Sequence, residues 1–168
     1  LIGVFASDHA IDDEAAFLTA WETAEQAAAE DYLVLLGIKP HEPATGYGYI
    51  KPSQGLAFNA AMPIHQVAQF VEKPDLAHAE EFVSEGYLWN SGMFIVRPNV
   101  LIQEAELYCA QLLHHCKLAV KSATKDLDFI RLSEQEFSQC EDVSLDYAII
   151  EHTQKAVVVP VDCGWNDV

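Results

Sequence analysis

The stretch Tyr-Leu-Val-Leu-Leu-Gly-Ile at residues 32–38 decides the fold class, because it is a nearly continuous apolar run. Such a run is typical of a strand that is buried on both faces of a sheet. A second run of this kind, Ala-Val-Val-Val-Pro-Val, occupies residues 156–161. Strands covered on both faces need helices on either side of their sheet, so the two runs predict an α/β domain.

Helical and strand patterns alternate along the rest of the chain. Apolar side chains recur at helical spacing in residues 11–30, and an apolar pattern marks a strand at residues 87–97. This alternation predicts a Rossmann-like layered α/β domain with a mainly parallel mixed sheet. The remaining elements are predicted as strands at 1–5 and 67–72, helices at 75–84, 100–120 and 144–151, and a short helix from Ser133.

One segment departs from the parallel pattern. Residues 47–51 and 57–58 flank the turn-forming sequence Pro-Ser-Gln-Gly at residues 52–55. Two short strand-like runs around such a turn are typical of a β-hairpin. We therefore expect a β-hairpin excursion here, as the one antiparallel part of the sheet.

The composition excludes several classes of protein. Apolar residues make up 51% of the chain and charged residues 21%, which is typical of a globular fold. No apolar run approaches the ~20 residues of a membrane helix, so no membrane association is expected. The net charge of −17 disfavours nucleic-acid binding, because recognition of a phosphate backbone depends on Lys and Arg. A polyphosphate ligand would need a divalent cation and local basic groups.

The cysteines Cys109, Cys116, Cys140 and Cys163 form neither a CxxC pattern nor a disulfide framework. Structural zinc needs tightly paired ligands, which this spacing does not supply, so no zinc site is expected. The sequence shows no export signal, and we therefore expect reduced thiols and a cytoplasmic protein.

Two aspartates follow apolar runs near opposite ends of the chain. Asp8 follows the first run and Asp167 follows the last, so each comes just after a predicted strand. Open α/β sheets bind their ligands at this edge. Carboxylate oxygens suit Mg²⁺, which would also relieve the repulsion between two close carboxylates. The simpler interpretation of either residue is a turn or a helix cap.

A charged pair ends the predicted strand at 67–72. Glu72 and Lys73 are followed by Pro74, which lacks an N–H donor and biases Lys73 toward extended backbone. Since the chain has only nine basic residues, a lysine held at a strand end is a candidate ligand for an anion. A weak surface ion pair with Glu72 is the competing interpretation.

Glycines and an amide interrupt two further strand-like segments. Gly46 and Gly48 alternate with aromatic residues, and glycine permits close approach of the backbone to a ligand. Asn90 follows Trp89 and offers both a donor and an acceptor, as sugar hydroxyls require. The simpler interpretations are a twisted hairpin entry for the glycines and a backbone-bonded bulge for Asn90.

In their order and spacing, these segments resemble the sugar-phosphate nucleotidyltransferase family, and within it the mannose-1-phosphate guanylyltransferase branch. The resemblance covers almost the whole chain and is more specific than a single nucleotide fingerprint. The segments that carry it are Ser7-Asp8-His9, Gly37-Ile38 through Ile50 with Thr45-Gly46-Tyr47-Gly48-Tyr49, Phe70 to Pro74, Trp89 to Phe94, Ser144 to Glu151, and Gly164 to Val168.

The resemblance implies an enzyme that transfers a guanylyl group from GTP to mannose 1-phosphate, giving GDP-mannose and pyrophosphate. Asp8, Lys73 and Asp167 would be its catalytic residues. The two aspartates would hold Mg²⁺, and Lys73 would bind the phosphate of the sugar. No covalent intermediate on the protein is needed, because the sugar phosphate attacks the α-phosphorus directly and the metal offsets the charge.

The resemblance also implies a sugar-binding set. Glu72 and Asn90 would bond the sugar hydroxyls, and the backbone of Gly46 would lie close to the sugar. Ala44 departs from the family pattern, since members often have Glu before the Thr-Gly-Tyr-Gly-Tyr segment. One carboxylate contact is therefore expected to be lost, while the glycine segment itself is kept.

Residues 1–168 are expected to form a single, incomplete nucleotidyltransferase domain. The family opens with a strand and a Gly-rich nucleotide loop, and nothing of that kind precedes Leu1. Some relatives also carry a C-terminal isomerase domain that this chain does not include. We expect the chain by itself to be inactive or nearly so.

Two alternatives stay open at the level of sequence. The first is a nucleotidyltransferase for another sugar phosphate or nucleotide, which substrate screening of the intact protein would distinguish. The second is a non-catalytic sugar-phosphate-binding module, which would bind its ligand without turnover. The sequence also leaves a homo-oligomer open.

Overall fold

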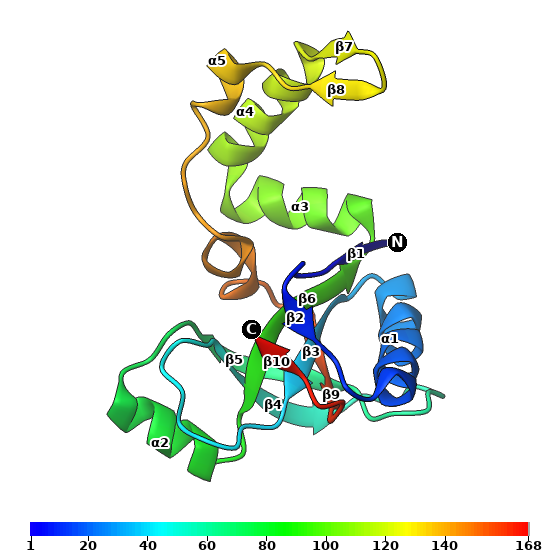
Figure 1. The fold of residues 1–168 in the computed structure, drawn as a ribbon, viewed down its shortest axis with the longest axis vertical. Helices are drawn as coiled ribbons and strands as arrows, with labels where there is room; N and C mark the ends of the chain where they lie inside the picture. Colours follow the sequence, from blue (N-terminus) through cyan, green and yellow to red (C-terminus); the bar gives the residue numbers. More distant parts are fainter. Residues whose placement is uncertain (168) are drawn as a thin grey trace. The chain divides into compact units, whose positions relative to one another are not determined.

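The computed structural model describes residues 1–167 and divides them into two compact units. The first unit contains residues 1–100 and the C-terminal residues from 153 onward, and the second contains residues 101–152. Figure 1 shows strands concentrated in the first unit and helices in the second. The expectation of one incomplete domain stays a prediction.

A closed arrangement of strands forms the centre of the first unit. The strand order is β1-β6-β3-β9-β5-β4, and a further pairing of β4 with β6 closes five of these strands into a ring. The strands are β1 (Ile2–Val4), β3 (Leu33–Ile38), β4 (Tyr49–Gly55), β5 (His65–Val71), β6 (Leu88–Val96) and β9 (Ala156–Val161).

The α/β class is confirmed, but the expectation of a mainly parallel sheet is wrong. Only β3 and β9, the two long apolar runs, pair in parallel; the other pairings described in this sheet are antiparallel. The apolar runs indicate only that both faces of these strands are buried. A closed ring buries both faces even when most neighbouring strands are antiparallel. Helix α1 (Glu14–Ala29) packs on β3 and β9, while the opposite face of β3 meets side chains of neighbouring ring strands.

The predicted hairpin exists, but its second arm was misplaced. β4 pairs with β5 rather than with residues 57–58, with Tyr49 opposite Val71 and Ile50 opposite Phe70. The chain does not turn at Pro52, because the strand passes through it with a shift in register. The loop closes later, where the Leu56 N–H donates to the Ile64 carbonyl at 2.8 Å.

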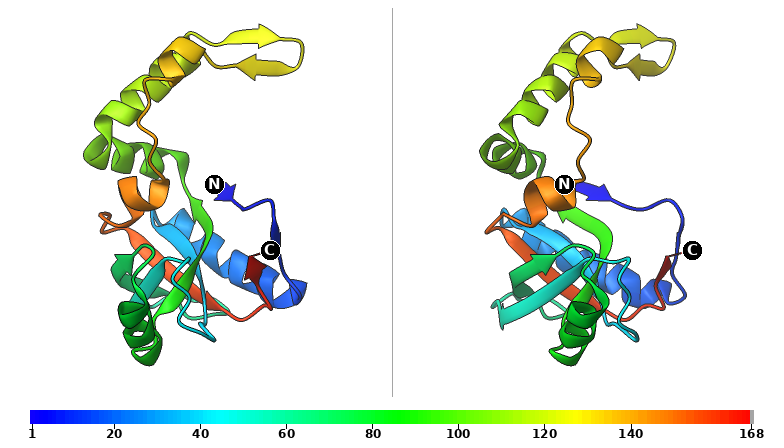
Figure 2. Two further views of the ribbon diagram at one scale, coloured as in Figure 1. Left: turned by 60° about the vertical axis from the view of Figure 1, so that its left-hand side comes forward. Right: turned by 90° about the vertical axis from the view of Figure 1, so that its left-hand side faces the viewer.

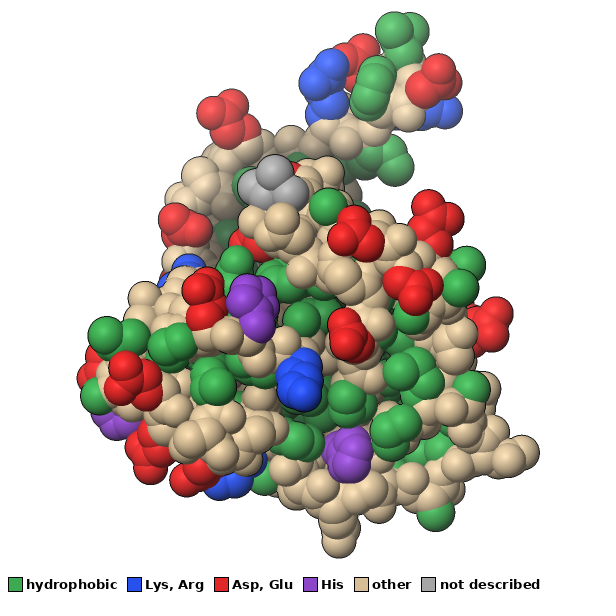
Figure 3. Space-filling model, turned by 60° about the horizontal axis from the view of Figure 1, so that its bottom comes forward, with side chains coloured by type: hydrophobic (Ala, Val, Ile, Leu, Met, Phe, Trp, Pro, Cys, Tyr) green, Lys and Arg blue, Asp and Glu red, His purple; other side chains and the backbone are tan. Residues whose placement is uncertain are grey.

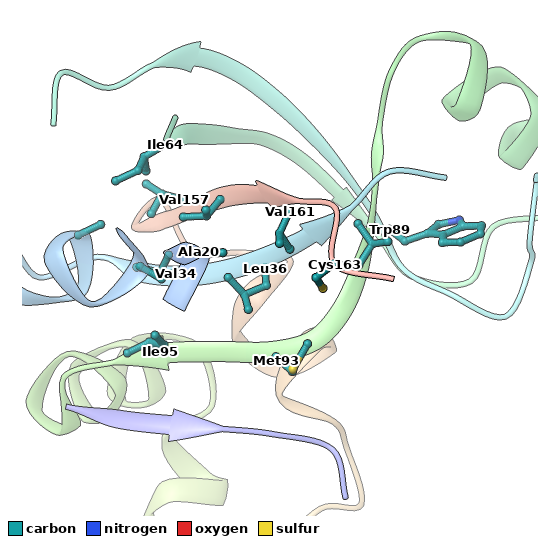
Figure 4. Close-up of a cluster of buried hydrophobic side chains, with 14 of the residues drawn as sticks. Ala20, Val34, Leu36, Ile64, Trp89, Met93, Ile95, Val157, Val161 and Cys163 are labelled. Carbon is teal, nitrogen blue, oxygen red and sulfur yellow. The ribbon is translucent and has the colours of Figure 1, made fainter. Parts of the chain in front are cut away.

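Small side chains bring α1 close to the ring. Asp13 caps the helix by accepting from the Ala16 N–H at 3.0 Å, which satisfies one of its free donors. Ala20 lies among Val34, Leu36 and Val157 (Figure 4), and it is completely buried. Alanine combines high helix propensity with little bulk, so the helix can pack tightly without disturbing the strands.

The second unit is built mainly from helices. The single helix predicted at residues 100–120 is two helices, because Cys109 adopts a non-helical backbone with φ −142° and ψ 50°. A β-hairpin and two short helical turns complete the unit (Figure 2). The elements are α3 (Pro98–Tyr108, which starts in the first unit), α4 (Ala110–Lys121), β7 (Thr124–Asp126), β8 (Phe129–Arg131), α5 (Glu134–Phe137) and a π-helix at Asp146–Ile150.

The short helix predicted from Ser133 is α5, and Ser133 Oγ caps it by accepting from the Glu136 N–H at 3.4 Å. The helix predicted at 144–151 is shorter, because the π-helix has Leu145 as its N-cap; Ser144 Oγ accepts from the Tyr147 N–H at 3.4 Å just before it. In the part of the chain that the structure describes, no helix is long and apolar enough to cross a membrane.

Candidate active site

A two-stranded pairing brings the two ends of the chain together. β2 (His9–Ala10) pairs antiparallel with β10 (Asn166–Asp167), with His9 opposite Asp167. Asp8 directly precedes β2, so the two predicted metal ligands lie on neighbouring segments although 159 positions separate them in sequence. Val168, the last residue of the closing motif, lies outside the described residues.

His9 holds this pairing in a defined orientation. Its Nδ1 accepts a hydrogen bond from Trp165 Nε1 at 3.1 Å, and its Nε2 lies 3.5 Å from Asp167 Oδ1. With Nδ1 as the acceptor, the neutral ring carries its proton on Nε2, facing the Asp167 carboxylate. Neither His9 nor Trp165 was predicted to contribute to the site, although both belong to the motifs that carry the resemblance.

Aromatic side chains in edge-to-face and tilted contact connect this pairing to two other motif segments. The centroid of the Trp165 ring lies 5.4 Å from that of Tyr47 and 6.5 Å from that of Trp89. The centroids of Tyr47 and Trp89 are 5.0 Å apart, in an edge-to-face arrangement. His41 also contacts Trp89, with a ring separation of 4.9 Å. Such aromatic pairs add about 0.5–1.5 kcal/mol each beyond their burial. Three segments that are distant in sequence therefore form one cluster.

The predicted sugar-binding residues Glu72 and Asn90 lie close together beside Gly48, and not beside Gly46 as expected. A Cβ at this position would collide with Glu72 Oε2, approach the Phe70 ring to 3.0 Å and approach Asn90 Cβ to 3.3 Å. The Asn90 N–H donates to the Gly48 carbonyl at 2.7 Å. Around Gly46, by contrast, a Cβ would meet no atom within 4 Å. Gly48 lets the strands approach, and the role of Gly46 beside a sugar stays a prediction.

Asn90 makes a local hydrogen bond as well. It is buried, and its Oδ1 accepts from the Gly92 N–H at 3.2 Å, where Gly92 has a left-handed φ of +73°. This contact agrees with the simpler interpretation of Asn90 as a backbone-bonded residue. The same hydrogen bond fixes the orientation of the side-chain amide, and a contact with a ligand would require a fixed orientation.

Lys73 presents its ammonium group to solvent. Its side chain is 61% exposed, and Nζ lies 3.8 Å from Glu72 Oε1, so the ion pair is loose. The backbone of Lys73 has φ +46°, a left-handed conformation that is uncommon outside glycine. The expectation of extended backbone before Pro74 is therefore wrong. Left-handed backbone at non-glycine residues costs of order 1–3 kcal/mol and is concentrated at ligand sites.

The electrostatic surroundings of the cluster are acidic. Burial raises the pKa of the Tyr47 phenol, and the negative charges of Asp167 and Glu42 raise that pKa further. On the face shown in Figure 3, acidic side chains are scattered among hydrophobic ones and basic side chains are few. A negatively charged substrate would therefore need a cation or a lysine at the site.

Asp8 and Asp167 are of the residue type that could hold a hard cation. Asp8 and Asp167 supply carboxylate oxygens, the ligands that Mg²⁺ prefers, and both residues are exposed. Within residues 1–167, no three His, Cys, Asp or Glu side chains group as a metal site. Mg²⁺ in proteins is often held by one or two carboxylates together with phosphates and water, and two exposed aspartates are compatible with a site of that kind.

The nucleotidyl transferase family profile matches residues 1–168. The chain belongs to the nucleotidyl transferase family. This confirms the resemblance that the motifs carry.

The mannose-1-phosphate guanylyltransferase of Escherichia coli K12 is 45% identical over 169 residues, covering 100% of this chain and 35% of that protein. The xanthan biosynthesis protein XanB of Xanthomonas campestris pv. campestris B100 shows the same identity and coverage. The chain thus spans about a third of the length of these two relatives.

Two solved structures have a fold similar to that of this chain. A structure described as mannose-6-phosphate isomerase from Helicobacter pylori has a TM-score of 0.87 and 33% identity, covering 98% of this chain and 63% of that chain. One described as mannose-1-phosphate geranyltransferase from Thermus thermophilus has a TM-score of 0.85 and 28% identity, covering 99% of this chain and 46% of that chain.

The two glycines of the Thr-Gly-Tyr-Gly-Tyr segment are expected to respond differently to substitution. Gly48→Ala forces Phe70 and Asn90 apart, and overpacking of this kind lowers the free energy of unfolding by about 1–3 kcal/mol. Gly46→Ala is the matched control and is expected to change it by less than about 0.5 kcal/mol, because its side chain enters open space. Denaturant unfolding measures both, and equal losses would contradict the packing around Gly48.

Asp167 is expected to contribute to the raised pKa of Tyr47. Asp167→Asn removes this charge but keeps the burial, which is the larger cause. The pKa of Tyr47 should therefore fall and still stay above its ordinary value of 10.0. Ultraviolet difference titration measures it, with Tyr47→Phe to identify the signal. An unchanged pKa would show that Asp167 does not lie near the phenol.

Proposed function

We propose that the protein containing this chain transfers a guanylyl group from GTP to mannose 1-phosphate, giving GDP-mannose and pyrophosphate. The observation that carries the proposal is the 45% identity, along the whole chain, to mannose-1-phosphate guanylyltransferase. The clustering of the motif residues around Trp165 supports it, because one ligand could contact several of them. The coverage of 35% of that relative supports the interpretation of the chain as part of a larger enzyme.

In this proposal the sugar phosphate binds beside Gly48. Lys73 has an exposed ammonium that would bind the phosphate as a charge-assisted donor. Glu72 and Asn90 lie close to the Gly48 backbone and would bond the sugar hydroxyls. The open space at Gly46 leaves room for the sugar against its backbone.

We propose Asp8 and Asp167 as the residues that would hold Mg²⁺. When bound, the cation would supply positive charge against the phosphates of GTP in an otherwise acidic chain. His9 would orient the Asp167 carboxylate through its Nε2 proton. Trp165 in turn holds His9, so the aromatic cluster would act as the support of this site.

The reaction itself would need positioning more than functional-group chemistry from the protein. A phosphate oxygen of mannose 1-phosphate forms a bond to the α-phosphorus of GTP, and the bond from that phosphorus to the β-phosphate oxygen breaks. Pyrophosphate leaves with the electron pair, and no proton has to be moved by a side chain. Alignment of two bound reactants can contribute about 7–11 kcal/mol to such a step. Lys73, Glu72 and Asn90 would provide this alignment for the sugar phosphate.

We further propose a cytoplasmic location. The proposed substrates and products are charged nucleotides and sugar phosphates, which do not cross membranes unaided.

The test uses the natural polypeptide that contains this chain. Pyrophosphate release from GTP, mannose 1-phosphate and Mg²⁺ is measured for the wild type and for Asp167→Asn. We expect turnover that falls by about 100-fold or more in the variant, as when one electrostatic contact to reacting phosphates is removed. Asp162→Asn is the matched control, since it removes an exposed acid five residues away and should retain activity.

The other outcomes of this assay decide between the alternatives. Turnover only with another nucleotide or sugar phosphate would move the assignment within the family. Binding of mannose 1-phosphate without turnover of any nucleotide would identify a non-catalytic module and contradict the proposal.

Lys73→Ala is expected to weaken use of the sugar phosphate. Loss of a hydrogen bond to a charged group costs about 1.5–3 kcal/mol, so kcat/KM for mannose 1-phosphate should fall by about 10- to 100-fold. Lys51→Ala is the control, because Lys51 is also partly exposed but pairs with Glu85 at 3.0 Å. Equal effects of the two substitutions in steady-state kinetics would contradict a specific role for Lys73.

A further inference from the structure

Two cysteines of the second unit lie with their sulfur atoms in contact. Cys116 Sγ and Cys140 Sγ are 3.8 Å apart, a hydrogen-bond distance for two thiols. Both are free thiols of intermediate burial, whereas Cys163 in the first unit is buried. Partial exposure gives a small solute access to the pair. The sulfur atoms of a disulfide are about 2.05 Å apart, so the two thiols need to approach by less than about 2 Å to form one.

Other contacts hold together the two segments that carry these thiols. Cys116 belongs to α4 and Cys140 follows α5, and the two helices pack against each other (Figure 2). The Ser133 N–H donates to the Ala119 carbonyl at 3.3 Å, and the Cys140 N–H donates to the Phe137 carbonyl at 3.0 Å. The proximity of the two sulfur atoms therefore follows from backbone packing.

The surroundings of the pair give its two thiols different roles. Burial raises the pKa of the Cys116 thiol, and the hydrogen bond with Cys140 raises that pKa further. Cys116 therefore keeps its proton and donates to Cys140 Sγ, and this contact would stabilise a thiolate at Cys140. Since the thiolate is the nucleophilic form of cysteine, Cys140 is the sulfur that attacks first.

We propose that Cys116 and Cys140 form a reversible disulfide when the protein meets a low-molecular-weight disulfide such as oxidised glutathione. Disulfides of cytoplasmic proteins are usually transient and serve catalysis or redox sensing. This bond would close a loop of residues 116–140, which contains β7, β8 and α5, and would tie the end of that loop to α4. The proposal does not depend on the proposed catalytic function.

The oxidation proceeds by two exchanges. The Cys140 thiolate forms a bond to one sulfur of oxidised glutathione, the bond between the two glutathione sulfurs breaks, and one glutathione leaves with the electron pair. Cys116 Sγ then gives up its proton and attacks Cys140 Sγ, and the second glutathione leaves with the electron pair of the mixed disulfide. Two protein thiols are oxidised, one glutathione disulfide is reduced, and the two thiol protons end on the two glutathione molecules.

The test uses the natural polypeptide that contains this chain. It is incubated with oxidised glutathione, its remaining thiols are alkylated, and it is digested with trypsin, which cleaves after Lys117 and Arg131 between the two cysteines. In mass spectra we expect the peptide that ends at Lys117 to be joined to peptide 132–155. Reduction with dithiothreitol should separate them. A wild type in which this joined species does not form overturns the proposal.

Single substitutions identify the sulfur atoms that take part. Cys140→Ser and Cys116→Ser should both abolish the joined species, and Cys116→Ser should collect glutathione on Cys140. Cys109→Ser is the matched control, because Cys109 lies in the same peptide as Cys116 and lines the same cavity of about 210 Å³. This variant should keep the joined species. A joined species that persists in Cys116→Ser, or is lost in Cys109→Ser, contradicts the assigned pair. Circular dichroism before oxidation establishes that each variant is folded.

Hydrogen exchange measures the effect of the bond on the second unit. We expect the amides of α4 to exchange about tenfold or more slowly in the oxidised wild type, because a closed loop of about 25 residues restricts the opened chain. Cys140→Ser with the same oxidant should show no slowing. Equal exchange in the oxidised and reduced wild type would overturn the proposal that the bond ties the loop to α4.

Discussion

The pairing of β4 with β6 is the contact on which the candidate site depends. It sets Tyr49 opposite Trp89 and Ile50 opposite Leu88, and it closes five strands into a ring. One residue further along, the Asn90 N–H donates to the Gly48 carbonyl. Because Gly48 has no side chain, the carboxylate of Glu72 and the side chain of Asn90 can occupy the space beside its backbone. Without this closure, the glycine segment and Asn90 would belong to separate parts of the sheet.

The aromatic cluster adds the C-terminal segment to this arrangement. Trp165 contacts Tyr47 and Trp89 through its ring and donates to His9 through its indole nitrogen. His9 then faces Asp167 across the pairing of β2 with β10. Apolar packing therefore supports a polar site: the rings are held by burial, and the carboxylate is oriented by the imidazole at the edge of the cluster. This is the usual relation between ligands and the residues that orient them.

Local features of the fold could be predicted from the sequence, and pairing partners could not. The apolar runs at 32–38 and 156–161 are buried strands as expected, and the short helix predicted from Ser133 forms. The direction of most strands, the second arm of the hairpin and the break at Cys109 were predicted wrongly. Periodicity reports which faces are buried, and it carries no information about which strand lies next to which.

The sequence by itself determined the class of fold, the family and the residue types available for chemistry, because burial patterns, caps and motifs are encoded over a few residues. It could name Asp8 and Asp167 separately, but they lie 159 positions apart. Only the tertiary structure decided that their segments meet, that Gly48 is the glycine of close approach, and that His9 and Trp165 support the site. These are contacts between distant segments, and their geometry follows from how the ring closes and how the aromatic side chains pack.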